Sequence, residues 1–261
     1  EKSMNPAPLI SICTVTHKRP GLLQLLEERI RSQTYPQDKI QWVILDDSPE
    51  PHKRYKNISD QHSPPAIKYI HLPEKLPLGK KRNESHLHCD GEIIVYMDDD
   101  DFYPPNRVEH AVEALLNSEK EIAGVSKLPI LSVENVDFWI SGPHGDNHAT
   151  PGTFAFKRSF LETHSYANDD TSGEEKEFLN HFTTPIIQLD PFQTILCIAH
   201  DSNTVGKHAM LPKRKDSYND TDETTRQDNL SQDQIKVLNL IAAEHRSACT
   251  TASITESRFI F

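Results

Sequence analysis

The chain has 261 residues, which is enough for one large domain or for one domain with an appendage. Its formal net charge at pH 7 is -11. A surface that binds nucleic acid or an anionic membrane needs clustered lysine and arginine, so this charge balance argues against both classes. It does not exclude a phosphate-bearing ligand, because a metal ion or a few local cations can hold one.

The cysteines and the apolar runs indicate the cellular compartment in which we expect the protein. Cys13, Cys89, Cys197 and Cys249 are far apart in the sequence and form no CxxC motif. Three of them lie in or beside apolar segments, so we expect reduced, buried thiols in a cytoplasmic protein, with attachment to the periphery of a membrane left open. No apolar run reaches the ~18 residues of a membrane-spanning helix, and no secretory signal precedes the first apolar segment.

The first half of the chain alternates between short apolar runs and amphipathic stretches. We predict strands over residues 9–15, 40–45, 67–72, 92–97 and 122–126, and helices after Pro20, over 79–88 and after Pro104 or Pro105. The last of these helices should bury one face, made of Val108, Val112, Leu115 and Leu116. This alternation indicates crossover units and a mainly parallel sheet flanked by helices. In such sheets, ligands bind beyond the carboxyl ends of the strands.

The pattern changes from about residue 129. Residues 136–140, 152–156, 186–189 and 194–198 predict short strands of a smaller mixed sheet, and residues 173–182 predict an acidic helix. We expect this half to pack on the first and to form the second wall of a cleft. Trp139 and the loop over 142–148 are candidates for shaping an acceptor subsite there; a core tryptophan beside a surface loop is the alternative.

A third change follows Pro212. Residues 213–228 are almost wholly charged or polar and predict a linker, whereas residues 231–245 predict an amphipathic helix. We therefore divide the chain into one domain over 7–211 and an appendage over 212–261, which we assign to tethering rather than catalysis. The apolar end after residue 258 suggests that a second domain follows.

Four consecutive carboxylates, Asp98 to Asp101, come directly after an apolar strand. Adjacent acids repel one another, so a folded protein keeps them most readily around a cation. Mg²⁺ and Mn²⁺ prefer such oxygen ligands, and one or two carboxylates suffice when phosphate oxygens complete the shell. A metal there would neutralise a departing nucleoside diphosphate. The alternative is a solvated acidic turn that caps the next helix.

Two further polar groups follow or precede strands. Asp46 and Asp47 end the second strand, where a carboxylate can accept hydrogen bonds from a ribose hydroxyl or a base; an ordinary Asp-Ser-Pro turn is the alternative. The segment 79–83 joins a glycine to Lys80, Lys81 and Arg82. Its cations could meet a base or a diphosphate, or could simply begin an exposed basic helix.

Taken in order, four stretches carry a resemblance: SICTVTHKRP over 11–20, VILDDS over 43–48, GKKRN over 79–83 and YMDDDD over 96–101. Together they resemble a family 2-type glycosyltransferase of the GT-A fold, over roughly residues 8–211. The resemblance implies an α/β chain with a mainly parallel central sheet flanked by helices, and a smaller mixed sheet on the acceptor side.

The same resemblance implies an activity. It points to metal-dependent, inverting transfer of a sugar from a nucleotide-diphosphate donor to a hydroxyl of a glycan, lipid-linked or protein acceptor. The metal would be Mn²⁺ or Mg²⁺, and family frequency favours a UDP-sugar as the donor.

The resemblance also implies site residues. The nucleotide-sugar would be bound by Thr14, His17, Arg19, Asp46, Asp47, Lys81, Arg82, Asp98 and Asp99. The metal would be bound by Asp100, with Asp98, Asp101 and His200 as further candidate ligands. The usual family pattern is Asp-x-Asp, so four acids in a row leave the register of these ligands open.

An inverting enzyme needs a general base to deprotonate the acceptor hydroxyl. The family usually supplies a Glu-Asp pair at a helix start, and this chain has Glu174 and Glu175 there. Glu175 stands where the family has aspartate and reaches one methylene further, so Glu174 remains an alternative base. An acid-rich first turn that satisfies the helix dipole is the non-catalytic interpretation.

Two other classes stay open. A nucleotidyltransferase of related α/β fold would usually have a Gly-rich, cationic loop after the first strand, but residues 14–21 contain one glycine. A non-catalytic nucleotide-sugar binding module would bind the same ligands without turnover.

Overall fold

The computed structural model describes residues 6–58, 63–134, 136–199 and 231–257, with side chains of the last helix described as far as Cys249. Its strands are β1 (Ile10–Thr16), β2 (Ile40–Asp46), β3 (Ala66–His71), β4 (Ile93–Tyr96), β5 (Ile122–Gly124), β6 (Leu128–Ser132), β7 (Phe138–Ser141), β8 (Ala155–Lys157), β9 (Ile186–Gln188) and β10 (Cys197–Ala199). Its α-helices are α1 (Pro20–Arg31), α2 (Leu78–His86), α3 (Arg107–Leu116), α4 (Glu175–Phe178), α5 (Pro191–Thr194) and α6 (Gln232–Ser257). Short 3₁₀ helices are η1 (Gln37–Lys39), η2 (Pro151–Thr153) and η3 (Arg158–Glu162).

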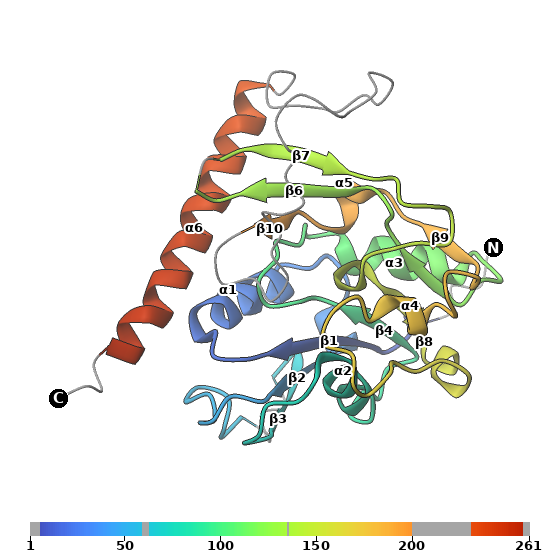
Figure 1. The fold of residues 1–261 in the computed structure, drawn as a ribbon, viewed down its shortest axis with the longest axis horizontal. Helices are drawn as coiled ribbons and strands as arrows, with labels where there is room; N and C mark the ends of the chain where they lie inside the picture. Colours follow the sequence, from blue (N-terminus) through green and yellow to red (C-terminus); the bar gives the residue numbers. More distant parts are fainter. Residues whose placement is uncertain (1–5, 59–62, 135, 200–230, 258–261) are drawn as a thin grey trace.

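The central sheet has seven strands in the order β3-β2-β1-β4-β8-β5-β9 (Figure 1). The first four are parallel, β8 runs antiparallel to both of its neighbours, and β9 is parallel to β5. The mainly parallel sheet is therefore confirmed. The five strands predicted before residue 126 are also confirmed, within two residues at each end.

Helices cover both faces of this sheet, which explains the continuous apolar runs of its central strands. Side chains alternate between the two faces of a strand. Ile10 and Ile12 of β1 therefore pack in one apolar cluster with residues of α1 and α3, whereas Cys13 packs in another with Phe178 of α4. All residues of β1 and β2 are buried, polar ones included. The buried strands therefore give rigid support to the residues that follow them at the carboxyl edge of the sheet.

The second half of the chain departs from the prediction. Strands β8 and β9 join the central sheet, and the smaller sheet is β10-β6-β7, of which β6 was not predicted. Strand β8 satisfies the main-chain groups of both β4 and β5, and such long-range pairing has no signature in the local sequence. The predicted strand over 152–156 is instead η2 followed by β8.

Two helix predictions were wrong in detail. The acidic helix expected over 173–182 is the single turn α4, because Asn180, His181 and Phe182 adopt positive φ angles that no α-helix contains. Leu116 was expected on the buried face of α3 but is 61% exposed. The predicted burial of Val108, Val112 and Leu115 is confirmed, and Ala111 and Arg107 are buried with them.

The C-terminal helix packs on the rest of the molecule. The helix predicted over 231–245 is confirmed and extends to Ser257 as α6, which lies along α1 and β6 (Figure 1). Ile241 and Ala242 pack against Leu131, Phe138 and Ile198 of the small sheet. The predicted linker lies outside the described residues, and the domain division at residue 211 stays a prediction. In the described part of the chain, α6 included, no helix has the length and apolarity needed to cross a bilayer.

The approach of α6 to α1 depends on Gly21. A Cβ atom at this position would lie 2.3 Å from the carbonyl oxygen of Ala248. Gly→Ala in a helix ordinarily stabilises, but here the added methyl must displace backbone. We expect Gly21→Ala to lower the free energy of unfolding by about 1–3 kcal/mol, measured by urea denaturation. Gln24→Ala, at an exposed position of α1, is the control and should change it by less than about 0.5 kcal/mol.

Candidate active site

A cleft of about 800 Å³ opens at the carboxyl ends of the parallel strands, at the edge where ligands were expected. One side is formed by the segments that follow β1 and precede α2, and the other by η2 and the start of α4. The residues that line the cleft are 15–19, 75–78, 81–82, 98–101, 150–152, 171 and 173–175. Leu128 and Cys197 of the small sheet and Ile195 beside it complete the lining. The acidic run, the basic pair and the acidic helix start therefore meet in one hollow.

Residues Asp98 to Asp101, the acidic loop, are held in place by a buried tyrosine. The Tyr103 hydroxyl accepts a hydrogen bond from the backbone N–H of Asp98 (2.7 Å) and donates one to the carbonyl of Gly152 (3.1 Å). Gly152 allows this approach, since a Cβ there would lie 3.1 Å from an Asp98 carboxylate oxygen. On the other side, Asp101 accepts a bond from the backbone N–H of Ile198 in β10 (2.8 Å). The loop is thus fixed to both sheets.

Arg19 meets the middle of the acidic loop. Its Nη1 lies 2.9 Å from an Asp99 oxygen and 3.2 Å from an Asp100 oxygen, and the Thr16 hydroxyl donates to Asp99 at 2.5 Å. Burial would lower the pKa of Arg19, but Asp99 and Asp100 outweigh it and raise that pKa above its ordinary value. Burial raises the pKa of Asp99 to about 6 despite the opposing charge of Arg19. Because Arg19 and Thr16 already bind the Asp99 carboxylate, it is poorly placed to bind a ligand directly.

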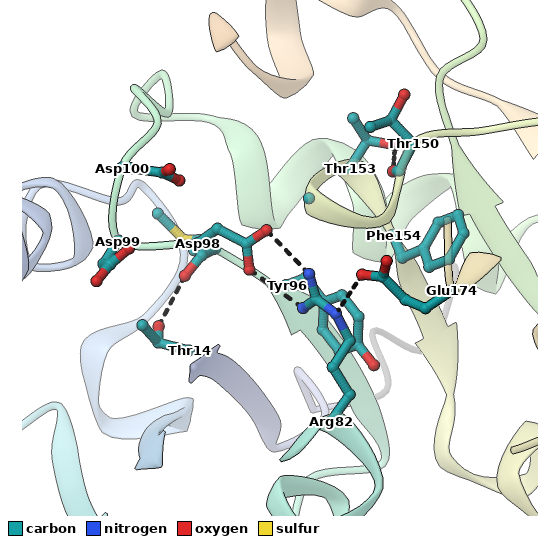
Figure 2. A network of polar contacts seen from close by, with 12 residues as sticks. Thr14, Arg82, Tyr96, Asp98, Asp99, Asp100, Thr150, Thr153, Phe154 and Glu174 are labelled. Atoms are coloured by element: carbon teal, nitrogen blue, oxygen red, sulfur yellow. Dashed lines mark hydrogen bonds and ion pairs between the residues drawn. The ribbon is translucent and has the colours of Figure 1, made fainter. Parts of the chain in front are cut away.

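Arg82 joins the acidic loop to the start of α4 (Figure 2). Two of its nitrogens donate to the two Asp98 oxygens at 3.2 and 3.1 Å, and its Nε donates to Glu174 at 3.1 Å. The guanidinium also lies over the ring of Tyr96, 4.8 Å from its centroid. Burial would lower the pKa of Arg82, which is 4% exposed, but Asp98 and Glu174 raise it. Arg82 therefore stays charged and holds both carboxylates.

Glu175 has a different environment from its neighbour Glu174. It is the first residue of α4 and lines the cleft, and burial raises the pKa of its carboxyl above the ordinary value, with Glu174 adding to the shift. Its one ion-pair contact among the described residues is His148, whose Nε2 lies 4.0 Å from an oxygen of Glu175. A carboxylate with a raised pKa that faces a cleft can accept a proton, whereas Glu174 is committed to Arg82.

Three predicted nucleotide-binding residues do not line the cleft. Thr14 is fully buried, and its hydroxyl donates to the Met97 carbonyl (2.7 Å) and accepts from the indole of Trp42 (2.9 Å). Asp46 accepts hydrogen bonds from the backbone N–H of Ser48 and the hydroxyl of Tyr69, so it shapes the turn after β2. Because both polar side chains have hydrogen-bond partners, they can be buried at the ends of the strands.

Asp47, the third, lies behind two residues that do line the cleft. Its buried carboxylate accepts from Lys81 Nζ at 2.6 Å, from the backbone N–H of Leu76 at 2.9 Å, and contacts His17 Nδ1 at 2.9 Å. Burial lowers the pKa of Lys81, and Asp47 opposes that shift. Asp47 thus positions the His17 and Lys81 side chains at the cleft.

Most of the other predicted site residues line the cleft. His17, Arg19, Lys81, Arg82, Glu174, Glu175 and all four acids of the loop line the cleft. Trp139 does not: it is 5% exposed and packs in the main core, so its expected role in a subsite is not supported. His200 lies outside the described residues.

Sequence reasoning missed several residues that build the site. Tyr103 and the buried Arg107 are the main ones; the Arg107 guanidinium donates to the carbonyls of Thr153 (2.8 Å) and Phe154 (3.0 Å) and so fixes η2 beside the acidic loop. Burial lowers the pKa of Arg107 to about 10. An arginine at the start of an amphipathic helix looks like a surface residue, so only the fold reveals this role.

The donor set fits a divalent metal that arrives with phosphate. Among the described residues, no group of three or more His, Cys, Asp or Glu side chains forms a ready-made metal cage. Carboxylate oxygens of the acidic loop nevertheless line the cleft, and hard cations need only one or two of them when phosphates supply the other ligands. Arg82 holds both oxygens of Asp98, Arg19 contacts Asp100, and the Ile198 N–H donates to Asp101, so a bound ion would share each of these carboxylates with a protein partner.

Solved structures identify the class of the fold. The structure matches a mannosyltransferase, PcManGT from Pyrobaculum calidifontis in complex with GDP-Man and Mn²⁺, with a TM-score of 0.60 and 18% identity, over 79% of this chain and 60% of that one. It also matches S. aureus TarS 1-349 in complex with UDP-GlcNAc, with a TM-score of 0.59 and 14% identity, over 75% of this chain and 60% of that one. The fold is therefore that of the GT-A glycosyltransferases, as expected.

The family model for glycosyl transferase family 2 matches residues 11–179, and the chain belongs to that family. A curated relative, an uncharacterized glycosyltransferase of Haemophilus influenzae, is 30% identical over 95 residues, which are 36% of this chain and 35% of the relative. The matched part is thus about a third of that relative's length, and 60% of each solved structure.

The Arg82 ion pairs can be tested by stability. In Arg82→Met, Asp98 and Glu174 lose their shared cation in a buried place, and we expect the free energy of unfolding to fall by about 3–5 kcal/mol in urea denaturation. Arg54→Met is the control, because Arg54 is exposed and its partner Glu27 keeps Arg31 and Tyr55. That variant should lose about 1 kcal/mol or less. Equal losses would contradict the central role of Arg82.

Proposed function

We propose that this protein is a metal-dependent, inverting glycosyltransferase that moves a sugar from a nucleotide diphosphate to an acceptor hydroxyl. The observation that carries the proposal is the joining of the acidic loop and the start of α4 in one cleft, with Arg82 bonded to both. A donor site and a proton acceptor must lie close together for such a reaction, and this arrangement supports both in one rigid frame.

The donor would occupy the side of the cleft lined by His17, Arg19 and Lys81. These side chains are held by the buried carboxylates behind them, so they can present charge and hydrogen-bond donors without losing much side-chain entropy on binding. Asp100, together with Asp101 or Asp98, would hold Mn²⁺ or Mg²⁺. When bound, that ion neutralises negative charge on the departing diphosphate.

Glu175 would act as the general base. It takes the proton from the acceptor hydroxyl as that oxygen attacks the anomeric carbon from the face opposite the diphosphate, and the sugar changes configuration in a single displacement. Burial raises the pKa of Glu175, which makes it a stronger base than an exposed glutamate. Glu174 would position the helix start through Arg82 rather than touch the substrate.

The test is a product analysis with a panel of donors. UDP-GlcNAc and GDP-mannose head the panel, because the similar structures were solved with these two donors. Each is incubated with Mn²⁺ or Mg²⁺ and with glycan, lipid-linked and peptide acceptors. Release of nucleoside diphosphate supports the proposal, release of pyrophosphate would mark a nucleotidyltransferase, and binding without turnover would mark a binding module. We propose a cytoplasmic setting, which the buried, reduced thiols of Cys13 and Cys89 support.

Asp100→Asn tests the metal ligand. The variant keeps the side-chain volume but loses the charge that attracts the cation. We expect transfer to fall at least about 100-fold, and the thermal stabilisation by UDP or GDP with Mn²⁺ to disappear. Asp137→Asn, at an exposed position, is the control. Full activity in Asp100→Asn would assign the metal to other ligands.

Glu175→Gln tests the base separately from donor binding. Because an amide cannot take the proton, we expect kcat to fall by about 10²–10⁴-fold while nucleotide affinity stays unchanged. In the parent enzyme, kcat should rise with pH through an apparent pKa above the ordinary glutamate value, since the ionised form is the active one. Asp169→Asn, an exposed acid of the preceding loop, is the matched control. Normal turnover by Glu175→Gln would move the base elsewhere.

A further inference from the structure

The loop over 142–148 ends beside the proposed base. His148 Nε2 lies 4.0 Å from a Glu175 oxygen, a distance that a small ring movement converts into a hydrogen bond. Its other ring nitrogen, Nδ1, is buried and makes no hydrogen bond within the part of the chain that the structure describes. His148 does not line the cleft, so any effect on the reaction would pass through Glu175. A partly buried imidazole beside a carboxylate is the arrangement of an orienting group.

A strained turn fixes the His148 ring from the other side. Asn180, His181 and Phe182 have φ angles of 51°, 57° and 61°, three consecutive residues in the left-handed region that side chains disfavour. This turn brings the Phe182 ring to 5.1 Å from the His148 ring, tilted by 32°. Strain of this kind persists where the surrounding structure holds it, and it gathers at functional sites.

We propose that His148 is a positioning residue for Glu175: packed against the tilted ring of Phe182, it donates its Nε2–H to the carboxylate and aims it at the acceptor hydroxyl. The inference rests on the proposed function, because it assigns a partner to the base of that reaction. The 4.0 Å separation is longer than a hydrogen bond, and the hydrogen bonds of catalytic groups often tighten only when the substrate binds.

The lowered pKa of His148 agrees with this role, because it favours the neutral imidazole. Burial lowers the pKa of His148, and His144, whose ring lies 5.1 Å away, adds to that shift. A neutral imidazole can donate one hydrogen bond without forming an ion pair that would weaken the base. The other charged or titratable groups that face Glu175 are Glu174, Asp170 and Arg82. Loss of the His148 donor would therefore disfavour the ionised carboxylate and raise the pKa of Glu175.

The test compares three variants of the whole chain. His148→Phe keeps a ring against Phe182 but has no donor, and His148→Gln restores an N–H near the Nε2 position. His144→Phe is the matched control, because His144 touches His148 and Ser141 but makes no contact with Glu175 among the described residues. The probe is whichever of UDP-GlcNAc and GDP-mannose the parent enzyme turns over, with water as acceptor, and kcat and KM are measured against pH.

We expect His148→Phe to lower kcat about tenfold and to move the acidic limb of the kcat profile upward by up to about one pH unit. The KM for the donor and the thermal stabilisation by UDP or GDP with Mg²⁺ should not change. His148→Gln should recover most of kcat and the original limb, and His144→Phe should behave as the parent.

Two outcomes overturn the proposal. A kcat within twofold of the parent and an unmoved acidic limb in His148→Phe would show that Glu175 needs no such partner. Equal losses in His148→Phe, His148→Gln and His144→Phe, with lowered melting temperatures, would show a purely structural loop. Both leave the glycosyltransferase proposal intact if the parent enzyme still releases nucleoside diphosphate; absence of that release in the parent would remove both proposals.

Discussion

A single buried guanidinium joins the two acidic elements of the cleft. Arg82 binds both oxygens of Asp98 and one oxygen of Glu174, and it lies against the ring of Tyr96. Without it, two carboxylates would repel each other in a place with little water to screen them. The position of the acidic loop relative to Glu175 therefore depends on this cation, and a fixed geometry between donor and base is what a single displacement requires.

Other buried groups complete the same frame. Tyr103 ties the backbone of the acidic loop to Gly152, and Arg107 ties the carbonyls of the neighbouring segment together. Asp47 works in the same manner on the opposite side, where it holds His17 and Lys81 from behind. The groups that face the cleft are thus supported by buried partners, so that little rearrangement is needed when a ligand arrives.

Much of this was predictable from the chain alone. The parallel strands follow from continuous apolar runs between amphipathic helices, and the strand-end position of Asp98 to Asp101 follows from the break in that pattern. Glu175 was predicted as the base from the family resemblance, which places an acidic pair at this helix start. The missed features are long-range ones: β8 joins the central sheet and α4 stops after one turn. For Trp139, the structure selects the core position that the sequence had left open as the alternative.

The sequence by itself determined the fold class, the family and the edge of the sheet at which charged groups gather, because periodicity and strand-end chemistry are local properties. Only the tertiary structure decided which carboxylates are already engaged. Glu174 looks no different in sequence from Glu175, yet it is engaged by Arg82, which comes from a distant segment, and the partners of Asp47 likewise come from distant segments. The same holds for His148, which meets Glu175 only because a strained turn and a separate loop converge. Contacts between segments far apart in the chain leave no periodic trace, so they become visible only when the chain is folded.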